Sequence, residues 1–253
     1  MSGSRDAAER LVLIHGGGVG PWMWRAQADA FSTRFDVCTP TLPGHDPARP
    51  GEEFGDHEAA ARSVAEQAGL DRPGPPATVV GFSLGGQVAL TLAAMHPDRV
   101  GRLVVVSSIV EPMPSMAASV GLLRPMIGLT RNERFARAQA RTLFVPDADF
   151  ADYFALSRAM SANTLVNLTR ANFTFAVPES VTASERPALL MMGSRERGTL
   201  RRGMIRLHDR WAASELAMFE GGGHGVMLSH PDAFDARFSA WLDSTTERLD
   251  DAP

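Results

Sequence analysis

The chain has 253 residues, of which 44% are hydrophobic, enough to bury one large α/β core without a second domain. Its 25 basic and 29 acidic side chains leave a formal net charge of only -4, which excludes the basic surface that nucleic acid or an anionic membrane requires. Every basic residue is arginine, which excludes Schiff-base chemistry and a lysine general base, and the single cysteine, Cys38, excludes a disulfide and a thiolate metal site.

The first ten residues, MSGSRDAAER, carry charged side chains and no apolar leader. No later stretch approaches the roughly 18 uninterrupted apolar residues of a membrane span. We therefore expect a cytoplasmic monomer or homodimer whose partner is a small-molecule substrate, with no nucleic acid or membrane bound.

Six short apolar runs alternate with longer amphipathic segments. Most of the runs are continuous Val, Leu, Ile or Met, as buried parallel strands are. This rhythm predicts an α/β fold with a mostly parallel sheet of about six strands and helices on both faces. The predicted strands are Leu11–His15, Phe35–Leu42, Ala77–Phe82, Leu103–Ser107, Ala188–Met192 and Glu215–Phe219.

Three segments between or after these strands have helical spacing. Asp56–Gly69 repeats Ala, Val and Leu at that spacing and ends in glycine, and Gly86–His96 is a small-residue helix closed by Pro97. The last predicted helix, Asp232–Leu242, carries three aromatic side chains on one face, which we assign to the core. The polar tail Asp243–Pro253 is expected to fray.

The alternation of strand and helix stops between the fourth and fifth predicted strands. This long segment has helical periodicity but no strand, which is typical of a lid. We therefore expect a core domain of residues 1–110 and 187–253 and a helical cap of residues 111–186. The cap is richer in Met and Phe than a surface segment requires. The cap residues predicted to bind substrate are Met113, Phe144 and Met160.

The strongest chemical signal is Gly81-Phe82-Ser83-Leu84-Gly85, a G-x-S-x-G between a β-branched run and a small-residue helix. A serine on such a turn takes strained backbone angles, and the turn forms only if the residues two before and two after it are small. The turn raises the hydroxyl above the sheet and aims the helix N-terminus at the reacting oxygen, so the Leu84 N–H can stabilise an oxyanion. Ser83 is the predicted nucleophile; an ordinary glycine-rich turn is the alternative.

A second glycine-rich loop, His15-Gly16-Gly17-Gly18, ends the first predicted strand. Its glycines allow backbone amides to approach a bound carbonyl, so we expect the second oxyanion donor to be the Gly17 N–H, with Gly18 as the alternative. A dinucleotide-binding loop is excluded because Pro21 stands where the third glycine of that motif belongs. Gly18 and Trp24 are expected to contact substrate.

The predicted base is His224, which follows the glycine-rich loop 221–223 directly after the last strand. A histidine on such a loop can reach over the sheet edge to the nucleophile. None of the other six histidines is placed in this way. Val226, two residues later, is predicted to contact substrate.

The acid that orients His224 should lie between the serine and the histidine in the chain, near the end of a strand. Glu196, after the fifth strand, and Glu111, after the fourth, both meet this condition. We favour Glu196 because it occupies the usual loop; its alternative role is a surface ion pair with a neighbouring arginine.

Together these segments resemble the successive motifs of the α/β-hydrolase superfamily. The resemblance rests, in chain order, on His15-Gly16-Gly17-Gly18, Pro43-Gly44-His45, Gly81-Phe82-Ser83-Leu84-Gly85-Gly86 and Gly223-His224. The first loop begins too early for the two-strand hairpin that many members carry. The run 224–229 is similar to the histidine loop of the short methylesterase and hydroxynitrile lyase branch, and Gly225 stands where the lyases require lysine, which favours the esterase side.

The resemblance implies a serine hydrolase that cleaves a small, largely apolar ester through an acyl-enzyme, with no metal and no organic cofactor. The same triad could instead cleave a lactone, a thioester or a carbon–carbon bond, or serve a cofactor-free cyclase, lyase or perhydrolase. A non-catalytic ligand-binding protein is the remaining alternative, although both glycine-rich loops are intact.

Overall fold

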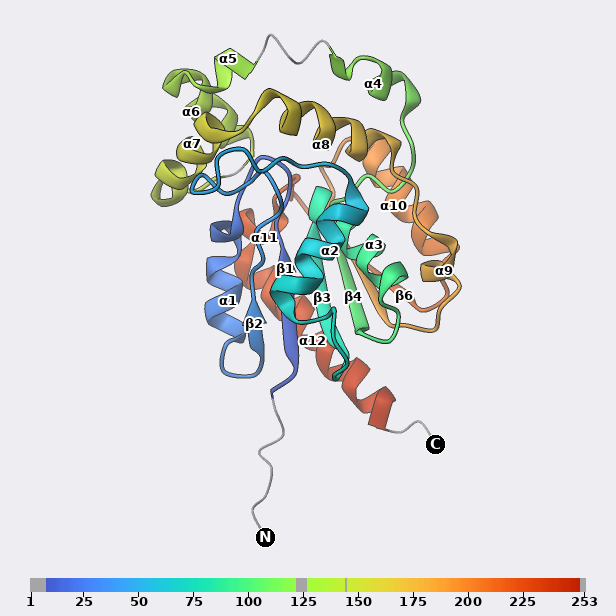
Figure 1. The fold of residues 1–253 in the computed structure, drawn as a ribbon. Helices are drawn as coiled ribbons and strands as arrows, with labels where there is room; N and C mark the ends of the chain where they lie inside the picture. Colours follow the sequence, from blue (N-terminus) through green and yellow to red (C-terminus); the bar gives the residue numbers. More distant parts are fainter. Residues whose placement is uncertain (1–7, 122–126, 144, 251–253) are drawn as a thin grey trace.

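The computed structural model describes residues 8–121, 127–143 and 145–250, and one six-stranded sheet in the order β2-β1-β3-β4-β5-β6 lies at its centre (Figure 1). All five neighbouring strand pairs are parallel. The strands are β1 (Arg10–Ile14), β2 (Asp36–Cys38), β3 (Ala77–Phe82), β4 (Val100–Val106), β5 (Ala188–Gly193) and β6 (Ser214–Phe219). The predicted α/β fold with about six strands is confirmed.

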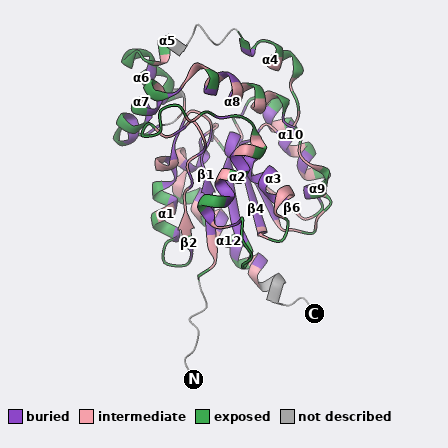
Figure 2. Cartoon of the chain, viewed as in Figure 1, coloured by how far each residue is buried: buried purple, intermediate pink, exposed green. Residues whose placement is uncertain are grey.

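The sheet separates two apolar clusters because successive side chains of a strand point to opposite faces. In β1, Leu11 and Leu13 belong to one cluster, whereas Val12 and Ile14 belong to the other. The inner strands are buried on both faces, which is why their sequences are continuously apolar. Figure 2 shows these buried strands between less buried helices.

Helices cover both faces of the sheet. The cluster that contains Val12 and Ile14 also contains residues of α2 (His57–Ala68), α3 (Leu84–Met95), α9 (Glu179–Thr182) and α10 (Gly198–Asp209). The opposite cluster contains residues of η1 (Pro21–Trp24), α1 (Arg25–Phe31), α11 (Val226–Ser229) and α12 (Pro231–Asp250). In Figure 1, α2 and α3 lie in front of the strands and α12 lies behind them.

The segment between β4 and β5 forms further helices above the carboxyl ends of the strands (Figure 1). They are α4 (Pro114–Ala118), α5 (Ile127–Thr130), α6 (Glu133–Thr142), η3 (Asp147–Asp149), α7 (Phe150–Ala159) and α8 (Ala162–Thr174). Several contacts fasten this segment to the sheet layer. They include an ion pair of Arg25 with the buried Asp149, and a hydrogen bond of 3.0 Å from Gln87 Nε2 in α3 to the carbonyl oxygen of Asn172 in α8.

Two predicted boundaries were wrong by four residues or more, and several others by one to three residues. β2 ends at Cys38 instead of Leu42; it is an edge strand, and Pro40 has no N–H to continue its ladder. α12 continues to Asp250 instead of ending at Leu242, so residues 243–250, which were predicted to fray, are helical. Thr245 is fully buried and contacts Arg102 of β4, which anchors the added turns. Across the described ranges, no helix is long and apolar enough to cross a membrane.

Candidate active site

The strand order reverses next to β1: β2 is added on one side of it, and the strands that follow are added on the other side. In an open parallel sheet, a crevice forms at the carboxyl ends of the strands at such a reversal. The loops after β1 and β3 meet there, and those after β5 and β6 leave the same edge of the sheet.

Ser83 stands on the turn between β3 and α3 with φ 52° and ψ -116°, a strained conformation for a residue other than glycine. The turn is tight: a Cβ on Gly81 would lie 2.2 Å from the carbonyl oxygen of Gly85, and a Cβ on Gly85 would lie 2.4 Å from that of Ile14. Only glycine fits these two positions. Ser108 also ties the turn, because its Oγ donates to the Ser83 carbonyl oxygen at 2.6 Å.

Three predicted side chains meet at this turn. Ser83 Oγ lies 3.1 Å from His224 Nε2, and His224 Nδ1 lies 3.0 Å from Glu196 Oε1. An ionised carboxylate only accepts hydrogen bonds, so Nδ1 carries the proton and Nε2 is free to accept the serine proton. The Glu196 side chain is 3% exposed and the His224 side chain 33%, so the carboxylate is enclosed while the imidazole remains accessible.

The loops that carry the acid and the histidine are held together by their backbones. A Cβ on Gly193 would lie 2.2 Å from the carbonyl oxygen of Gly222, and the Arg195 N–H donates to that same oxygen at 2.9 Å. The Gly221 N–H donates to Ser194 Oγ at 2.9 Å. Because β5 and β6 are neighbours, their loops leave the sheet side by side, and these contacts bring Glu196 to His224.

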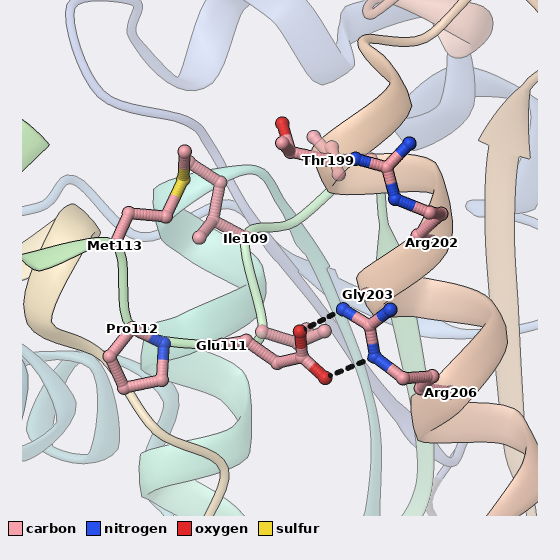
Figure 3. Close-up of a pocket in the computed structure, with 10 residues that line it drawn as sticks. Ile109, Glu111, Pro112, Met113, Thr199, Arg202, Gly203 and Arg206 are labelled. Atoms are coloured by element: carbon pink, nitrogen blue, oxygen red, sulfur yellow. Dashed lines mark hydrogen bonds and ion pairs between the residues drawn. The ribbon is translucent and has the colours of Figure 1, made fainter. Parts of the chain in front are cut away.

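Glu111, the alternative acid, forms a two-point ion pair with Arg206 of α10 (Figure 3). Its hydrogen bond to Arg206 lowers the pKa of Glu111 below its usual value. The pair lines a cleft of about 170 Å³ between the end of β4 and α10. Met113, which the sequence predicted at the substrate site, lines this same cleft.

The predicted oxyanion loop follows β1 and touches the start of α3. A Cβ on Gly17 would lie 3.3 Å from the Leu84 side chain, so the two predicted donors come from adjacent segments. The Gly18 N–H donates to His45 Nε2 at 3.1 Å, which removes Gly18 as an alternative donor. In the described part of the chain, the N–H groups of Gly17 and Leu84 donate no such bond.

A cavity of about 180 Å³ opens beside the oxyanion loop, between it and the helices above the sheet. Of the predicted substrate residues, Gly18 and Met160 line it together with Gly17. The sequence did not single out the other lining residues, whose only signal was helical periodicity within an apolar segment. These residues are Thr130, Gln139, Leu143, Tyr153, Ser157, Leu165 and Leu168.

Like Met113, the predicted substrate residues Trp24 and Val226 do not line this cavity. Trp24 is fully buried and packs against Phe234 of α12 with ring centroids 6.2 Å apart. Val226 is also fully buried, in the same apolar cluster. Phe144 lies outside the described residues. Trp24 and Val226 were predicted from their positions after the two glycine-rich loops, but the structure places both side chains in the apolar core.

Known proteins match this chain over almost its whole length. The sequence profile described as alpha/beta hydrolase family matches residues 11–237. The chain is 32% identical over 259 residues to the pimeloyl-[acyl-carrier protein] methyl ester esterase of Neisseria meningitidis serogroup C, covering 94% of this chain and 95% of that protein. It is 31% identical over 247 residues to the protein of the same name from Aromatoleum aromaticum, covering 88% and 93%.

Solved structures share the fold. An esterase from Exiguobacterium antarcticum superposes with a TM-score of 0.76 at 17% sequence identity, and the match covers 94% of this chain and 92% of that one. At this identity the likeness concerns the arrangement of strands and helices only.

Proposed function

The chain belongs to the alpha/beta hydrolase family, and from that premise we propose that it cleaves small, largely apolar carboxylic esters through a triad of Ser83, His224 and Glu196. Its relatives are methyl ester esterases, and the chain is a carboxylic ester hydrolase. The observation that carries the proposal is the unbroken series of hydrogen bonds from Glu196 Oε1 through both ring nitrogens of His224 to Ser83 Oγ.

The geometry supports the following reaction. His224 Nε2 takes the Ser83 proton as the serine oxygen attacks the ester carbonyl carbon, and the resulting imidazolium gives that proton to the departing alcohol. Water, deprotonated by the same nitrogen, then attacks the acyl-serine ester and releases the acid. Glu196 stays ionised, holds the proton on Nδ1 and stabilises the imidazolium.

The negative oxygen that forms in both attacks needs donors that are already in place. The Leu84 N–H, at the first position of α3, and the Gly17 N–H serve this role in the proposal. The Leu84 amide gains from the positive end of a helix of 12 residues. The strained angles at Ser83 put its hydroxyl and the Leu84 amide at the same turn.

The cavity beside Gly17 is the proposed acyl site. Its volume of about 180 Å³ accommodates a short to medium acyl chain. Leu165 and Leu168 from α8 and Met160 supply its apolar lining, so the helices between β4 and β5 act as a cap over the substrate. The methyl ester in the names of the relatives favours a small alcohol portion.

A labelling experiment tests the proposal. A fluorophosphonate probe should add once to the intact wild-type protein by mass spectrometry, and the protein should hydrolyse methyl and aryl esters of two- to eight-carbon acids. Ser83→Ala should abolish both. Hydrolysis of the methyl ester of pimeloyl-[acyl-carrier protein] should be compared with hydrolysis of free dimethyl pimelate. The comparison shows whether the enzyme requires the carrier protein.

Ser107 provides a matched control. It too follows a strand and has a positive φ of 49°, and its hydroxyl is buried, with no hydrogen-bond partner among the described residues. Ser107→Ala should therefore keep labelling and turnover near wild type. Labelling that survives in Ser83→Ala, or a folded wild-type protein that takes no probe and cleaves no ester, would contradict the proposal.

A further inference from the structure

We propose that His45 is a positioning residue that fixes the Gly17 amide in the oxyanion hole by holding the neighbouring Gly18. The inference rests on the proposed esterase mechanism. The oxyanion loop has little means of holding its own shape: Gly16, Gly17 and Gly18 have no side chains to pack, and Gly18 lies in the left-handed region with φ +75°. A donor on such a loop is placed only as accurately as its hydrogen bonds place it.

Two buried imidazoles supply those hydrogen bonds. His45 Nε2 accepts from the Gly18 N–H at 3.1 Å, and its Nδ1 donates to the Pro43 carbonyl oxygen at 3.0 Å. His15 Nε2 accepts from the Leu42 N–H at 3.0 Å. The loop after β1 is thus tied to residues 42–45 at two places, each through an imidazole whose proton sits on Nδ1.

The two rings also pack against each other, with centroids 5.1 Å apart. His15 is fully buried and His45 is 2% exposed. Burial lowers the pKa of His45 to about 4, so its Nε2 is an unprotonated acceptor at neutral pH. An acceptor is the group that the Gly18 N–H requires, since a protonated imidazole would present a second donor there.

The loop that carries His45 is itself fixed from above by the cap. Gly44 has φ +73°, and a Cβ at this position would lie 2.7 Å from Thr164 Oγ1 of α8. Thr164 Oγ1 also accepts from the Phe54 N–H at 3.2 Å. Leu168 of the same helix lines the proposed acyl cavity. His45 therefore links the helix that lies over the acyl group to the loop that holds the oxyanion.

The consequence for the reaction is specific. His45 accepts from the Gly18 N–H, and this bond holds the peptide unit between Gly17 and Gly18. The Gly17 N–H adjoins that unit and donates no hydrogen bond among the described residues, so it remains available to the reacting oxygen. Releasing Gly18 frees the loop to rotate, while Ser83, His224 and the apolar side chains that line the cavity from the helices above the sheet stay in place. A small displacement of a donor from the developing charge costs much of its effect. The loss should therefore fall on kcat and leave KM nearly unchanged.

Three substitutions at one position test this. His45→Leu keeps the approximate volume but has no acceptor, and it should lower kcat about 30- to 100-fold with KM within about threefold. His45→Gln presents an amide oxygen near the place of Nε2 and should restore kcat to within about fivefold of wild type. If His45→Leu does not fold, His45→Asn replaces it, because its oxygen ends near the place of Nδ1 and does not reach Gly18.

The decisive readout is inhibition by a trifluoromethyl ketone matched to the acyl chain. Its adduct with Ser83 carries a negative oxygen, so its affinity should fall in parallel with kcat, while binding of the product acid stays constant. Unchanged kcat in the folded variant without the acceptor, or a fall in kcat with unchanged ketone affinity, overturns the inference. If wild-type protein cleaves no ester, the proposed function fails first; if Ser83→Ala is inactive and His45→Leu is not impaired, only the role of His45 fails.

Discussion

Replacing each of the two predicted acids by its amide distinguishes a positioned carboxylate from a surface ion pair. In Glu196→Gln the side chain keeps its size but loses its charge. The amide can turn its NH₂ toward His224 Nδ1, which favours the tautomer with the proton on Nε2, and that tautomer cannot take the proton of Ser83. The imidazolium that forms on His224 also loses its counter-charge during the reaction.

The size of the effect follows from burial and geometry. The Glu196 side chain is 3% exposed and bonds Nδ1 at 3.0 Å, so solvent cannot replace it. We expect kcat to fall about 1,000- to 10,000-fold, which corresponds to roughly 4 to 5.5 kcal/mol in the barrier. The Glu111 and Arg206 side chains are 37% and 54% exposed, and an ion pair of this kind contributes about 0 to 1 kcal/mol to stability.

The assay is steady-state hydrolysis of one short-chain aryl ester, with circular dichroism to confirm that each variant is folded. Glu111→Gln should keep kcat within about twofold of wild type, with at most a small change in thermal midpoint. The reasoning is refuted if Glu196→Gln retains near wild-type kcat while Glu111→Gln loses several orders of magnitude. If neither matters, water or a backbone group orients His224.

Further predictions each rest on one local feature. Gly193→Ala would put a methyl group 2.2 Å from the backbone of the histidine loop, so kcat should fall about 100-fold. Gly55→Ala, with nothing within 4 Å, should leave kcat unchanged. Leu168→Trp should fill the acyl cavity and lower hexanoyl ester turnover about tenfold relative to acetyl ester. Burial lowers the pKa of His15 to about 3 and of His45 to about 4, so stability in urea should fall by roughly 2 kcal/mol from pH 6 to pH 5.

The sign of the last prediction follows from where the protons bind. Below the ordinary histidine pKa of about 6.5, His15 and His45 bind protons in the unfolded chain but stay unprotonated in the folded chain. The stabilisation is therefore complete above that pH and is lost as the pH falls toward 4. His45→Gln should reduce the slope, to which the lowered pKa of the partly buried His57 also contributes. An unchanged slope would show that the burial of His45 does not cause it. For Leu168→Trp, equal losses on both esters would show that the cavity does not hold the acyl chain.

The strands could be predicted because a sheet covered on both faces has no polar face. β3 was predicted with both ends correct, and the largest overestimate was the edge strand β2. The extension of α12 could not be read from apolar spacing. Its added turns depend on Arg102, which reaches from β4 to Thr245 and Thr246, and no local pattern in the sequence reveals that polar contact.

The proposed triad was predictable for a related reason. Ser83, Glu196 and His224 each follow a strand, and the parallel order of the sheet puts all three strand ends on one edge. What the sequence left open was the choice between two acids. It depended on which loop packs against the histidine loop, and β5 is the neighbour of β6, whereas β4 is not.

The glycines of the site could be recognised from the sequence because backbone atoms crowd these positions and leave no room for a side chain. Gly81, Gly85 and Gly193 each lie where a Cβ would come within 2.4 Å of a backbone carbonyl oxygen. The acyl cavity has no such requirement, since any apolar side chain of suitable size can line it. Positions that are dictated by backbone contact can therefore be predicted from one sequence, whereas Leu165 and Leu168 could be placed only once α8 was seen above Gly17. The same reasoning implies that changes of substrate preference within this fold should map to the cap helices and leave the glycine-rich loops untouched.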